Sequence, residues 1–454
     1  MSVHIRFLGG AGTVTGSKYL IEHDGQSLLV DCGLFQGYKQ LRLRNRDPLP
    51  VLPNRIGAVL LTHAHLDHSG YLPLLHREGF HGKVWATPAT RDLAQILLPD
   101  SGHIQEEDAA FANRKGFSKH APALPLYTEE DALKSLKLFR TVPMREAFEP
   151  LRGWHARFSS AGHILGAASL LLEVGGRRLL FSGDLGRPDD VLMLPPDPPP
   201  AADVVICEST YGDRNHPQED VVAELGPALA RAAARGGTAV VPVFAVGRAQ
   251  EILFAIHQLK ASGQLPHGLP VYLDSPMAIE STELFCQHLG EHRLNAGQCR
   301  DIGHVARMVR SVEESKAIAR QHGPKVILAA SGMATGGRVL HHLAQHLGDH
   351  RNMVVLTGYQ APGTRGATLA AGHPSLRIHD QDMPVRAEVV QLTSASAHAD
   401  SNQLMAWLKA LPSAPRRVFV THGDMEASDR LRHRIETELR WQALVPEHGS
   451  TWLA

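Results

Sequence analysis

The chain has 454 residues, 43% of them apolar and 20% charged, so it has the composition of a globular protein and is long enough for two hydrophobic cores. Lys and Arg together number 46, as do Asp and Glu, which excludes a basic field over the whole molecule. A cytoplasmic protein is expected, because no apolar stretch reaches the roughly 18 residues of a membrane span, no signal-peptide pattern opens the chain, and the four cysteines lack paired spacing.

The first half of the chain predicts short strands, several of which end at a polar residue. Apolar runs predict strands, whereas segments rich in Ala, Leu, Gln and Glu predict helix. Helix is predicted over 88–136, with a polar break at 115–122. The predicted strands are 3–7, 18–21, 27–30, 58–61, 156–159, 169–174, 178–182 and 203–207.

In the second half, helices and strands alternate, which is typical of an α/β domain with a largely parallel sheet. The alternating elements are predicted at 218–235, 238–243, 247–259, 271–273, 326–329, 337–345 and 352–357. Strand, helix and strand then follow at 387–392, 401–410 and 417–421. We expect an insertion in a split first domain, with the first part at 1–208, the inserted domain at 209–385 and the C-terminal part at 386–454.

The segment LTHAHLDHSG carries the strongest chemical signal. It places His63, His65, Asp67 and His68 within six consecutive positions, directly after a predicted buried strand. Imidazole suits zinc, and a carboxylate can bind a second ion. A metal site is therefore predicted at this loop.

Three further candidate ligands each follow the end of an apolar strand: His163 in SSAGHILGA, Asp184 in FSGDLG and His422 in VTHGD. Seven ligands suit two ions. His63, His65 and His163 would bind one, Asp67, His68 and His422 the other, and Asp184 would bridge them.

The pattern HAHLDH, followed by GH, GD and HG, resembles that of the metallo-β-lactamase superfamily of dinuclear zinc hydrolases. The resemblance implies an αββα sandwich and two Zn²⁺ ions per chain. It also implies that Asp31, at the end of the third predicted strand, supports the metal loop without binding metal. An ordinary turn aspartate is the alternative for that residue.

ESTYGDR from Glu208, SASAHAD with His398 and VTHGD with His422 resemble the β-CASP branch, whose members cut nucleic acids. The chain is most similar to prokaryotic relatives of the endonuclease subunit of the mRNA 3′-end cleavage machinery. Histidine at position 422 is typical of members that act on RNA. FAVGRAQE, SGMATGG and GYQAPGTRG also look like this branch, which implies that the segment beginning at Glu208 is an inserted β-CASP domain.

The resemblance implies a zinc ribonuclease that leaves 5′-phosphate and 3′-hydroxyl ends. We expect single-stranded RNA as the substrate, endonuclease action with 5′-exonuclease action as a second mode, and a hydroxide nucleophile held by both metals. His398 would be the general acid, oriented by Glu208, and Asp67 is the third candidate catalytic residue. A core histidine is the alternative for His398. A homodimer is compatible with the sequence.

Candidate contacts with the RNA are Ser331 and Gly332 in the SGMATGG loop, Arg248 and Arg365. Small residues before a helix expose backbone N–H groups to phosphate. A tight turn and surface salt bridges explain these residues equally well. Two other functions stay open: a hydrolase of small esters or thioesters, which would need no inserted domain, and an RNA-binding relative without activity, against which the full ligand set argues.

Overall fold

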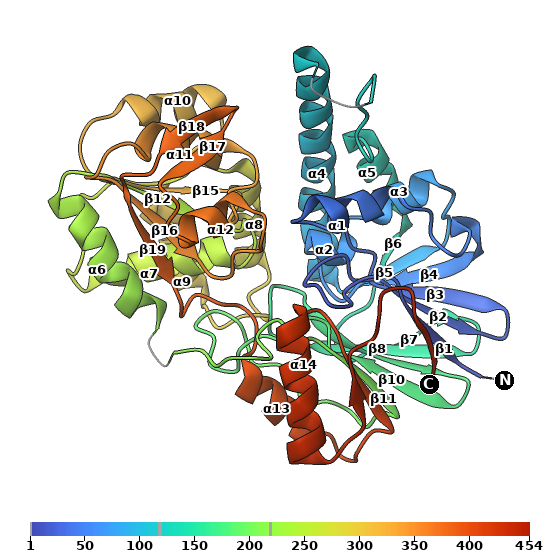
Figure 1. Cartoon of the computed structure of the whole chain (residues 1–454). Coiled ribbons are helices and arrows are strands. Elements are labelled where there is room, and N and C mark those ends of the chain that lie inside the picture. The colour runs from blue at the N-terminus through green and yellow to red at the C-terminus, as the bar shows by residue number, and fades with distance from the viewer. Residues whose placement is uncertain (1, 117–119, 218–219) are drawn as a thin grey trace. The chain divides into compact units, whose positions relative to one another are not determined.

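The computed structural model describes residues 2–116, 120–217 and 220–454 (Figure 1). The chain divides into two compact units, one made of Met1–Asn215 with His398–Ala454 and the other of His216–Ala397. Each unit has its own sheets and its own core, so each is described by itself.

The described part of the first unit contains two seven-stranded sheets. The first sheet has the order β22 (Thr451–Leu453), β1 (His4–Phe7), β2 (Tyr19–His23), β3 (Gln26–Val30), β4 (Ile56–Leu60), β5 (Lys83–Ala86) and β6 (Phe139–Thr141). The second has the order β21 (Ala443–Leu444), β20 (Arg417–Val420), β11 (Val204–Cys207), β10 (Arg177–Phe181), β9 (Ala168–Val174), β8 (Trp154–Ser160) and β7 (Ala147–Leu151).

Alternate side chains along a strand of the first unit pack against the layer on one side of the sheet and then the layer on the other. Successive side chains of a strand point to opposite faces of its sheet. Leu28 and Val30 of β3 pack with Leu170 and Leu172 of β9 in the core between the sheets, whereas Leu29 packs under the helices. Burial of one such leucine contributes roughly 1.5–3 kcal/mol.

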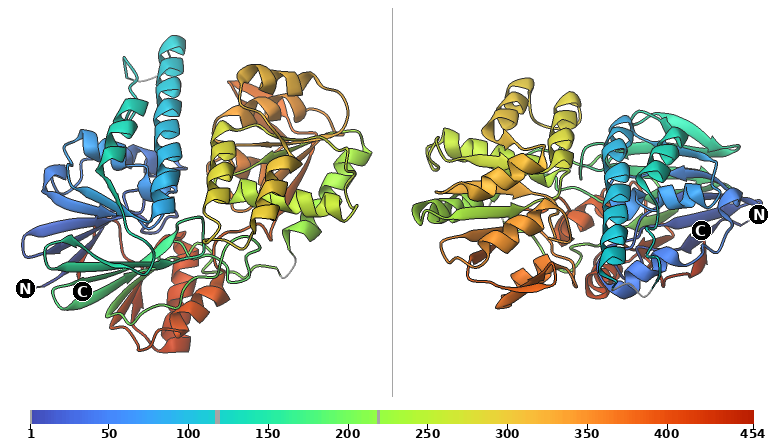
Figure 2. Two further views of the ribbon diagram at one scale, coloured as in Figure 1. Left: turned by 180° about the vertical axis from the view of Figure 1, so that it is seen from behind. Right: turned by 90° about the horizontal axis from the view of Figure 1, so that it is seen from above.

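Helices cover the outer face of each sheet in the first unit (Figures 1 and 2). α3 (Leu72–Arg77), α4 (Pro88–Lys115) and α5 (Glu129–Ser135) lie on the first sheet, and α13 (Ser401–Lys409) and α14 (Met425–Arg434) lie by the second. The layers therefore run helix, sheet, sheet, helix. The predicted αββα sandwich is confirmed.

The second unit is built on a six-stranded sheet in which every described pair is parallel. Its order is β14 (Arg307–Met308), β13 (Val271–Leu273), β15 (Lys325–Ala329), β12 (Thr238–Pro242), β16 (Met353–Thr357) and β19 (Glu388–Leu392). The helices are α6 (Val221–Ala234), α7 (Arg248–Ala261), α8 (Pro276–Gln287), α9 (Ala296–Val305), α10 (Val312–Arg320), α11 (Arg338–His346) and α12 (Arg365–Ala370), and a hairpin joins β17 (Ser375–Ile378) to β18 (Gln381–Pro384). The predicted parallel α/β domain is confirmed.

The strand β19 changes the expected division of the chain. It pairs with β16 over its whole length and so completes the sheet of the second unit, although the boundary at 385/386 assigned it to the returning part of the first. Residues 218 and 219, at the start of a predicted helix, lie outside the described residues, as do 117–119 in the predicted polar break. Among the helices that the structure describes, none has both the length and the apolar character to cross a membrane.

Candidate metal centre

The candidate ligands lie at one edge of the first unit, where parallel strands of both sheets end. β3 runs parallel to β4, and β10 runs parallel to β11, which runs parallel to β20. The loop after β4 carries His63 and His65, the short helix α2 (Leu66–Ser69) carries Asp67 and His68, and Asp184 and His422 follow β10 and β20. His163 lies in the turn between β8 and β9. Residues distant in the sequence thereby meet at one place.

The loop from His63 to His68 is held from behind by backbone hydrogen bonds. The N–H groups of Ser17, Cys32 and Leu34 donate to the carbonyls of Asp67, His68 and Leu66 at 2.9, 2.7 and 2.8 Å. The segments are so close that a Cβ atom on Gly33 would lie 1.6 Å from the Asp67 carbonyl oxygen. This contact requires glycine at position 33 and fixes where the loop places its side chains.

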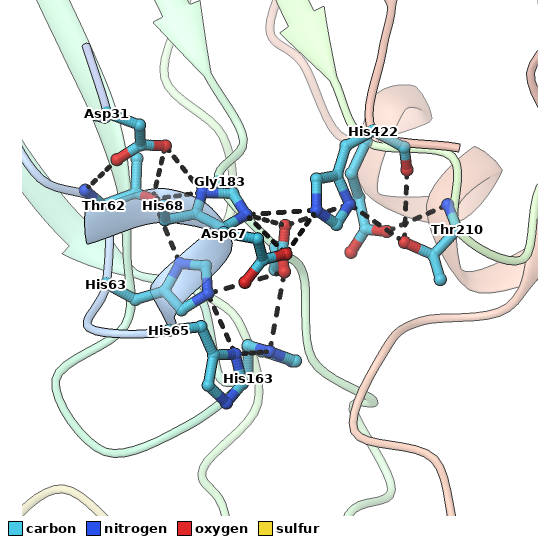
Figure 3. Close-up of polar contacts among 12 residues, drawn as sticks. Asp31, Thr62, His63, His65, Asp67, His68, His163, Gly183, Thr210 and His422 are labelled. Carbon is cyan, nitrogen blue, oxygen red and sulfur yellow. Dashed lines mark hydrogen bonds and ion pairs between the residues drawn. The ribbon is translucent and has the colours of Figure 1, made fainter. Parts of the chain in front are cut away.

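The first group of candidate ligands is His63, His65, His163 and Asp184 (Figure 3). Nδ1 of His65 lies 3.2 Å from Nε2 of His63 and 3.2 Å from Nε2 of His163. Oδ2 of Asp184 lies 3.5 Å from Nε2 of His63 and 3.7 Å from Nε2 of His163. Four donor atoms thus surround one point.

The second group is Asp67, His68, His422 and Asp184 (Figure 3). Nε2 of His422 lies 3.1 Å from Nε2 of His68 and 3.2 Å from Oδ2 of Asp67. Oδ1 of Asp184 lies 3.3 Å from Nε2 of His68. The two oxygens of Asp184 therefore face different groups, which is the arrangement that a bridging carboxylate needs.

The donor set of both groups fits divalent metal. In tetrahedral zinc, with Zn–N distances of about 2.0–2.1 Å, neighbouring ligand atoms lie about 3.4 Å apart. The separations given above, together with 3.8 Å between Nε2 of His68 and Oδ2 of Asp67, are between 3.1 and 3.8 Å. Imidazole nitrogens held this close repel one another unless a cation or a proton lies between them, so the arrangement is suited to metal.

Burial and charge act differently on the histidines. Burial lowers the pKa of His63 well below its ordinary value and that of His65 to about 4, which leaves both rings neutral, as metal ligands must be. Burial also opposes protonation of His68, but the carboxylates of Asp184, Asp31 and Asp67 outweigh it and raise the pKa of this ring. The second group therefore demands positive charge, which a metal ion would supply in place of the proton.

Asp31 orients the metal loop without belonging to either group. Its Oδ1 accepts a hydrogen bond of 2.8 Å from the Thr62 N–H, and its Oδ2 accepts one of 2.9 Å from the Thr62 hydroxyl. Nδ1 of His68 lies 2.8 Å from the same Oδ2. The carboxylate thus turns Nε2 of His68 toward the second group (Figure 3). This position suits the supporting role expected of Asp31.

His398 and Glu208 form a pair beside both groups. Nδ1 of His398 lies 3.2 Å from Oε1 of Glu208, and the two residues form a third group of donor atoms with Asp184. Burial lowers the pKa of His398, but the carboxylates of Glu208, Asp184 and Asp67 outweigh it and raise the pKa to about 9. The Glu208 side chain is 1% exposed, and it also accepts hydrogen bonds from the N–H groups of Leu185 and Thr210.

The four candidate RNA contacts all lie in the second unit, whereas the metal groups lie in the first. Arg248 is 7% exposed and forms an ion pair with Glu251. Arg365 donates to the carbonyls of Ala334, Thr335 and Arg377, which ties its helix to the SGMATGG loop. The Ser331 hydroxyl accepts a hydrogen bond from the Thr335 N–H, and a Cβ atom on Gly332 would lie 2.6 Å from the Phe244 ring.

Three residues that are not candidate ligands support the site through hydrogen bonds and were not predicted from the sequence. Thr62 and Thr210 contact ligand rings through their hydroxyls, and the Lys18 ammonium donates to the Gly33 carbonyl at 2.5 Å. Thr62 directly precedes a ligand, which was the available signal. Lys18 ends a glycine-rich turn and carries no pattern of its own.

Three family models match successive parts of the chain. The metallo-beta-lactamase superfamily model matches residues 11–228, and the Beta-Casp domain model matches residues 249–369. A model described as the Zn-dependent metallo-hydrolase RNA specificity domain matches residues 382–446. The first and last of these include all seven candidate ligands together with Glu208 and His398.

Several curated proteins are similar over most of the chain. Ribonuclease TTHA0252 of Thermus thermophilus is 40% identical over 92% of each chain. An RNase J-like protein of Methanocaldococcus jannaschii is 30% identical over 99% of each chain. Transcription termination factor FttA of Methanosarcina mazei is 32% identical over 96% of this chain and 69% of its own. The crystal structure of a protein of unknown function from Enterococcus faecalis V583 shares the fold, with a TM-score of 0.54 at 13% identity over 100% of both chains.

Proposed function

Because the chain belongs to the β-Casp branch of the metallo-β-lactamase superfamily, we propose that it is a zinc-dependent ribonuclease with two metal ions per chain. The family membership predicted from HAHLDH and ESTYGDR is confirmed. The observation that carries the proposal is the convergence of seven ligands into two groups that share Asp184, with His398 and Glu208 beside them. Relatives named as ribonucleases support RNA as the substrate.

Each group of ligands would hold one zinc ion. His63, His65 and His163 would hold the first, and Asp67, His68 and His422 the second, with Asp184 between them. Bound zinc lowers the pKa of water and withdraws charge from phosphoryl oxygens, which is the chemistry that phosphodiester hydrolysis needs. Asp67 contributes to catalysis as a ligand of the second ion.

The Glu208–His398 pair would deliver a proton to the leaving 3′ oxygen of the RNA. Glu208 accepts a hydrogen bond from Nδ1 of His398, which leaves Nε2 as the proton donor. The buried carboxylate also stabilises the protonated ring. The products would then be a 3′-hydroxyl and a 5′-phosphate, made by endonuclease action with 5′-exonuclease action as a second mode. We further propose action on single-stranded RNA in the cytoplasm, which suits the four free thiols.

The deciding experiment incubates the zinc-loaded protein with end-labelled single-stranded RNA and with DNA of the same sequence. We expect cleavage of RNA with 5′-phosphate ends, little cleavage of DNA, and loss of cleavage after chelation. A thioester and a lactone are tested in parallel. Efficient hydrolysis of either, together with intact RNA, would replace the proposal with a small-molecule hydrolase. Intact substrates throughout, with zinc bound, would indicate an RNA-binding protein.

A further inference from the structure

Thr210 lies between a candidate metal ligand and the candidate acid pair. Its side-chain hydroxyl is 3.2 Å from Nδ1 of His422 and 3.2 Å from the His422 carbonyl oxygen (Figure 3). Its backbone N–H donates to Oε2 of Glu208 at 3.2 Å. The residue is 7% exposed, so water does not compete freely for these contacts.

The two contacts of the hydroxyl determine which nitrogen of His422 carries hydrogen. The hydroxyl has one hydrogen, and the His422 carbonyl can only accept, so the hydroxyl donates to the carbonyl. It then accepts a hydrogen bond from Nδ1–H of the ring. Oδ1 of Asp184 lies 3.4 Å from Nδ1, and Oδ2 of Asp67, which would be a ligand of the same ion, lies 3.2 Å from Nε2. Nε2 therefore keeps its lone pair, and it faces Asp67 and His68.

The backbone of His422 also needs support. Its φ is +48°, in the left-handed region that residues other than glycine adopt at a cost. Its N–H donates to the Gly10 carbonyl at 2.6 Å, and its carbonyl accepts from the Ser209 N–H and the Thr210 hydroxyl at 3.2 Å each. Thr210 thus restrains both the ring and the peptide of this ligand.

The second group has two histidines, His68 and His422, and the nearest partners of their Nδ1 atoms differ in charge. Nδ1 of His68 lies 2.8 Å from the carboxylate of Asp31, whereas the nearest partner of Nδ1 of His422 is the neutral Thr210 hydroxyl at 3.2 Å, with Oδ1 of Asp184 at 3.4 Å. A carboxylate stabilises a cationic ring, but a hydroxyl mainly fixes its direction. Because the same residue also bonds Glu208 through its backbone, Thr210 links the second metal group to the acid pair.

We propose that Thr210 is a positioning residue for the second metal ion. Its hydroxyl stabilises the His422 tautomer in which Nε2 is free to bind the metal. Its N–H fixes the position of the Glu208 carboxylate relative to that metal site. The inference rests on the proposed dinuclear site and concerns the second ion only.

The test compares Thr210→Val, which keeps the shape and removes the hydroxyl, with Thr210→Ser, which keeps the hydroxyl. Thr357→Val is the matched control, because it removes a buried threonine hydroxyl bonded to the Pro242 carbonyl in the other unit. Zinc is titrated into metal-free full-length protein, and both dissociation constants are measured by competition with a chromophoric chelator. We expect Thr210→Val to weaken the second site by about 10–100-fold and leave the first unchanged.

The serine variant and the control make the outcome specific. We expect Thr210→Ser to restore second-site affinity close to wild type and Thr357→Val to leave both sites unchanged. Two tight sites in Thr210→Val would overturn the inference. An equal loss at both sites, with a lower melting temperature of the metal-free protein, would also overturn it, because the role would then be structural. A wild-type protein that binds one zinc ion would instead contradict the proposed dinuclear site.

Discussion

The carboxylate of Glu208 accepts hydrogen bonds from groups that belong to three separate segments of the first unit. Oε1 lies 2.6 Å from the Leu185 nitrogen and 3.2 Å from Nδ1 of His398, and Oε2 lies 3.2 Å from the Thr210 nitrogen. Leu185 directly follows the candidate bridging ligand. At the scale of single residues, the acid pair and the metal groups are therefore positioned by shared contacts.

His398→Ala tests the role of the acid pair. Because the ring would donate the proton to the leaving oxygen, its removal should lower kcat by roughly 100–10,000-fold. Zinc content, measured by mass spectrometry of the dialysed protein, should stay at the wild-type level, since His398 belongs to neither of the two groups that the seven candidate ligands form. His433→Ala, on the exposed side of α14, is the control and should leave kcat unchanged. Wild-type kcat in His398→Ala would remove this residue from the mechanism.

Lys18 is a buried cation behind the metal loop. Its ammonium lies 4.6 and 4.8 Å from the ring centres of Phe35 and Tyr71, and burial lowers its pKa from 10.5 to about 8. In the unfolded chain the pKa returns to its ordinary value. Between pH 8 and 10.5 the unfolded state therefore binds more protons than the folded state, so this residue makes the protein more stable as the pH rises.

Lys18→Met should remove this pH dependence. The free energy of unfolding of wild type minus that of Lys18→Met should increase by up to about 3 kcal/mol between pH 7.5 and pH 10.5. The measurement is urea unfolding of the metal-free proteins at both pH values. A difference that does not change with pH would mean that the lysine is already solvated in the folded protein.

At the scale of elements, the contact between the segment after β3 and the metal loop is the tightest feature of the site. Gly33→Ala should force the loop away, because the new Cβ would lie 1.6 Å from the Asp67 carbonyl oxygen and 2.8 Å from the His68 nitrogen. We expect a loss of stability of roughly 1–3 kcal/mol and weaker zinc binding. Melting temperature and zinc content report the two effects.

Gly303→Ala is the matched control for that change. Gly303 lies in α9, and apart from its chain neighbours and the backbone of its own helix, no heavy atom of the described residues lies within 4 Å of the position its Cβ would take. Alanine favours helix over glycine by up to about 1 kcal/mol, so this variant should keep or gain stability and keep its zinc. If Gly33→Ala also bound zinc normally, the loop would have more freedom than its contacts indicate.

Periodicity predicted the strands that carry the ligands closely. For example, the predicted strand 178–182, which precedes Asp184, corresponds to β10 (Arg177–Phe181), and the predicted strand 417–421, which precedes His422, corresponds to β20 (Arg417–Val420). The helices α8, α9 and α10 were not predicted, because apolar runs do not mark where they begin. Each starts at a capping side chain, which is Ser275, Asn295 and Ser311 respectively.

Site residues that directly follow a strand were predicted from the sequence. Residues that only orient another site residue were not. His163, Asp184 and His422 each follow an apolar strand, so their position at the sheet edge follows from the pattern. Thr210 acts on His422 across 212 positions of the sequence, a distance at which the chain gives no local signal. Arg248 reads as a surface cation, but it is buried and forms an ion pair with Glu251 in the first turn of α7.

At the scale of the whole molecule, the five tryptophans offer a way to observe one unit alone. All of them lie in the first unit, at positions 85, 154, 407, 441 and 452. Since the candidate ligands belong to the same unit, chelation should lower the midpoint of the thermal transition followed by tryptophan fluorescence. A transition of the second unit, followed by circular dichroism, should stay where it was. A single transition that moves as a whole with chelator would show that the units unfold together.

The ligands His68 and His422 are 354 positions apart, and the whole second unit lies between them in the sequence. Under the proposed function, the second metal site therefore cannot form on a growing chain until the ribosome has passed the inserted unit and reached the last strands of the first. A product of premature termination would carry the motif HAHLDH and still lack a ligand. Such fragments would not cleave the messenger RNA from which they are being translated. Because the last ligand lies late in the chain, cleavage of that messenger RNA during translation would be prevented.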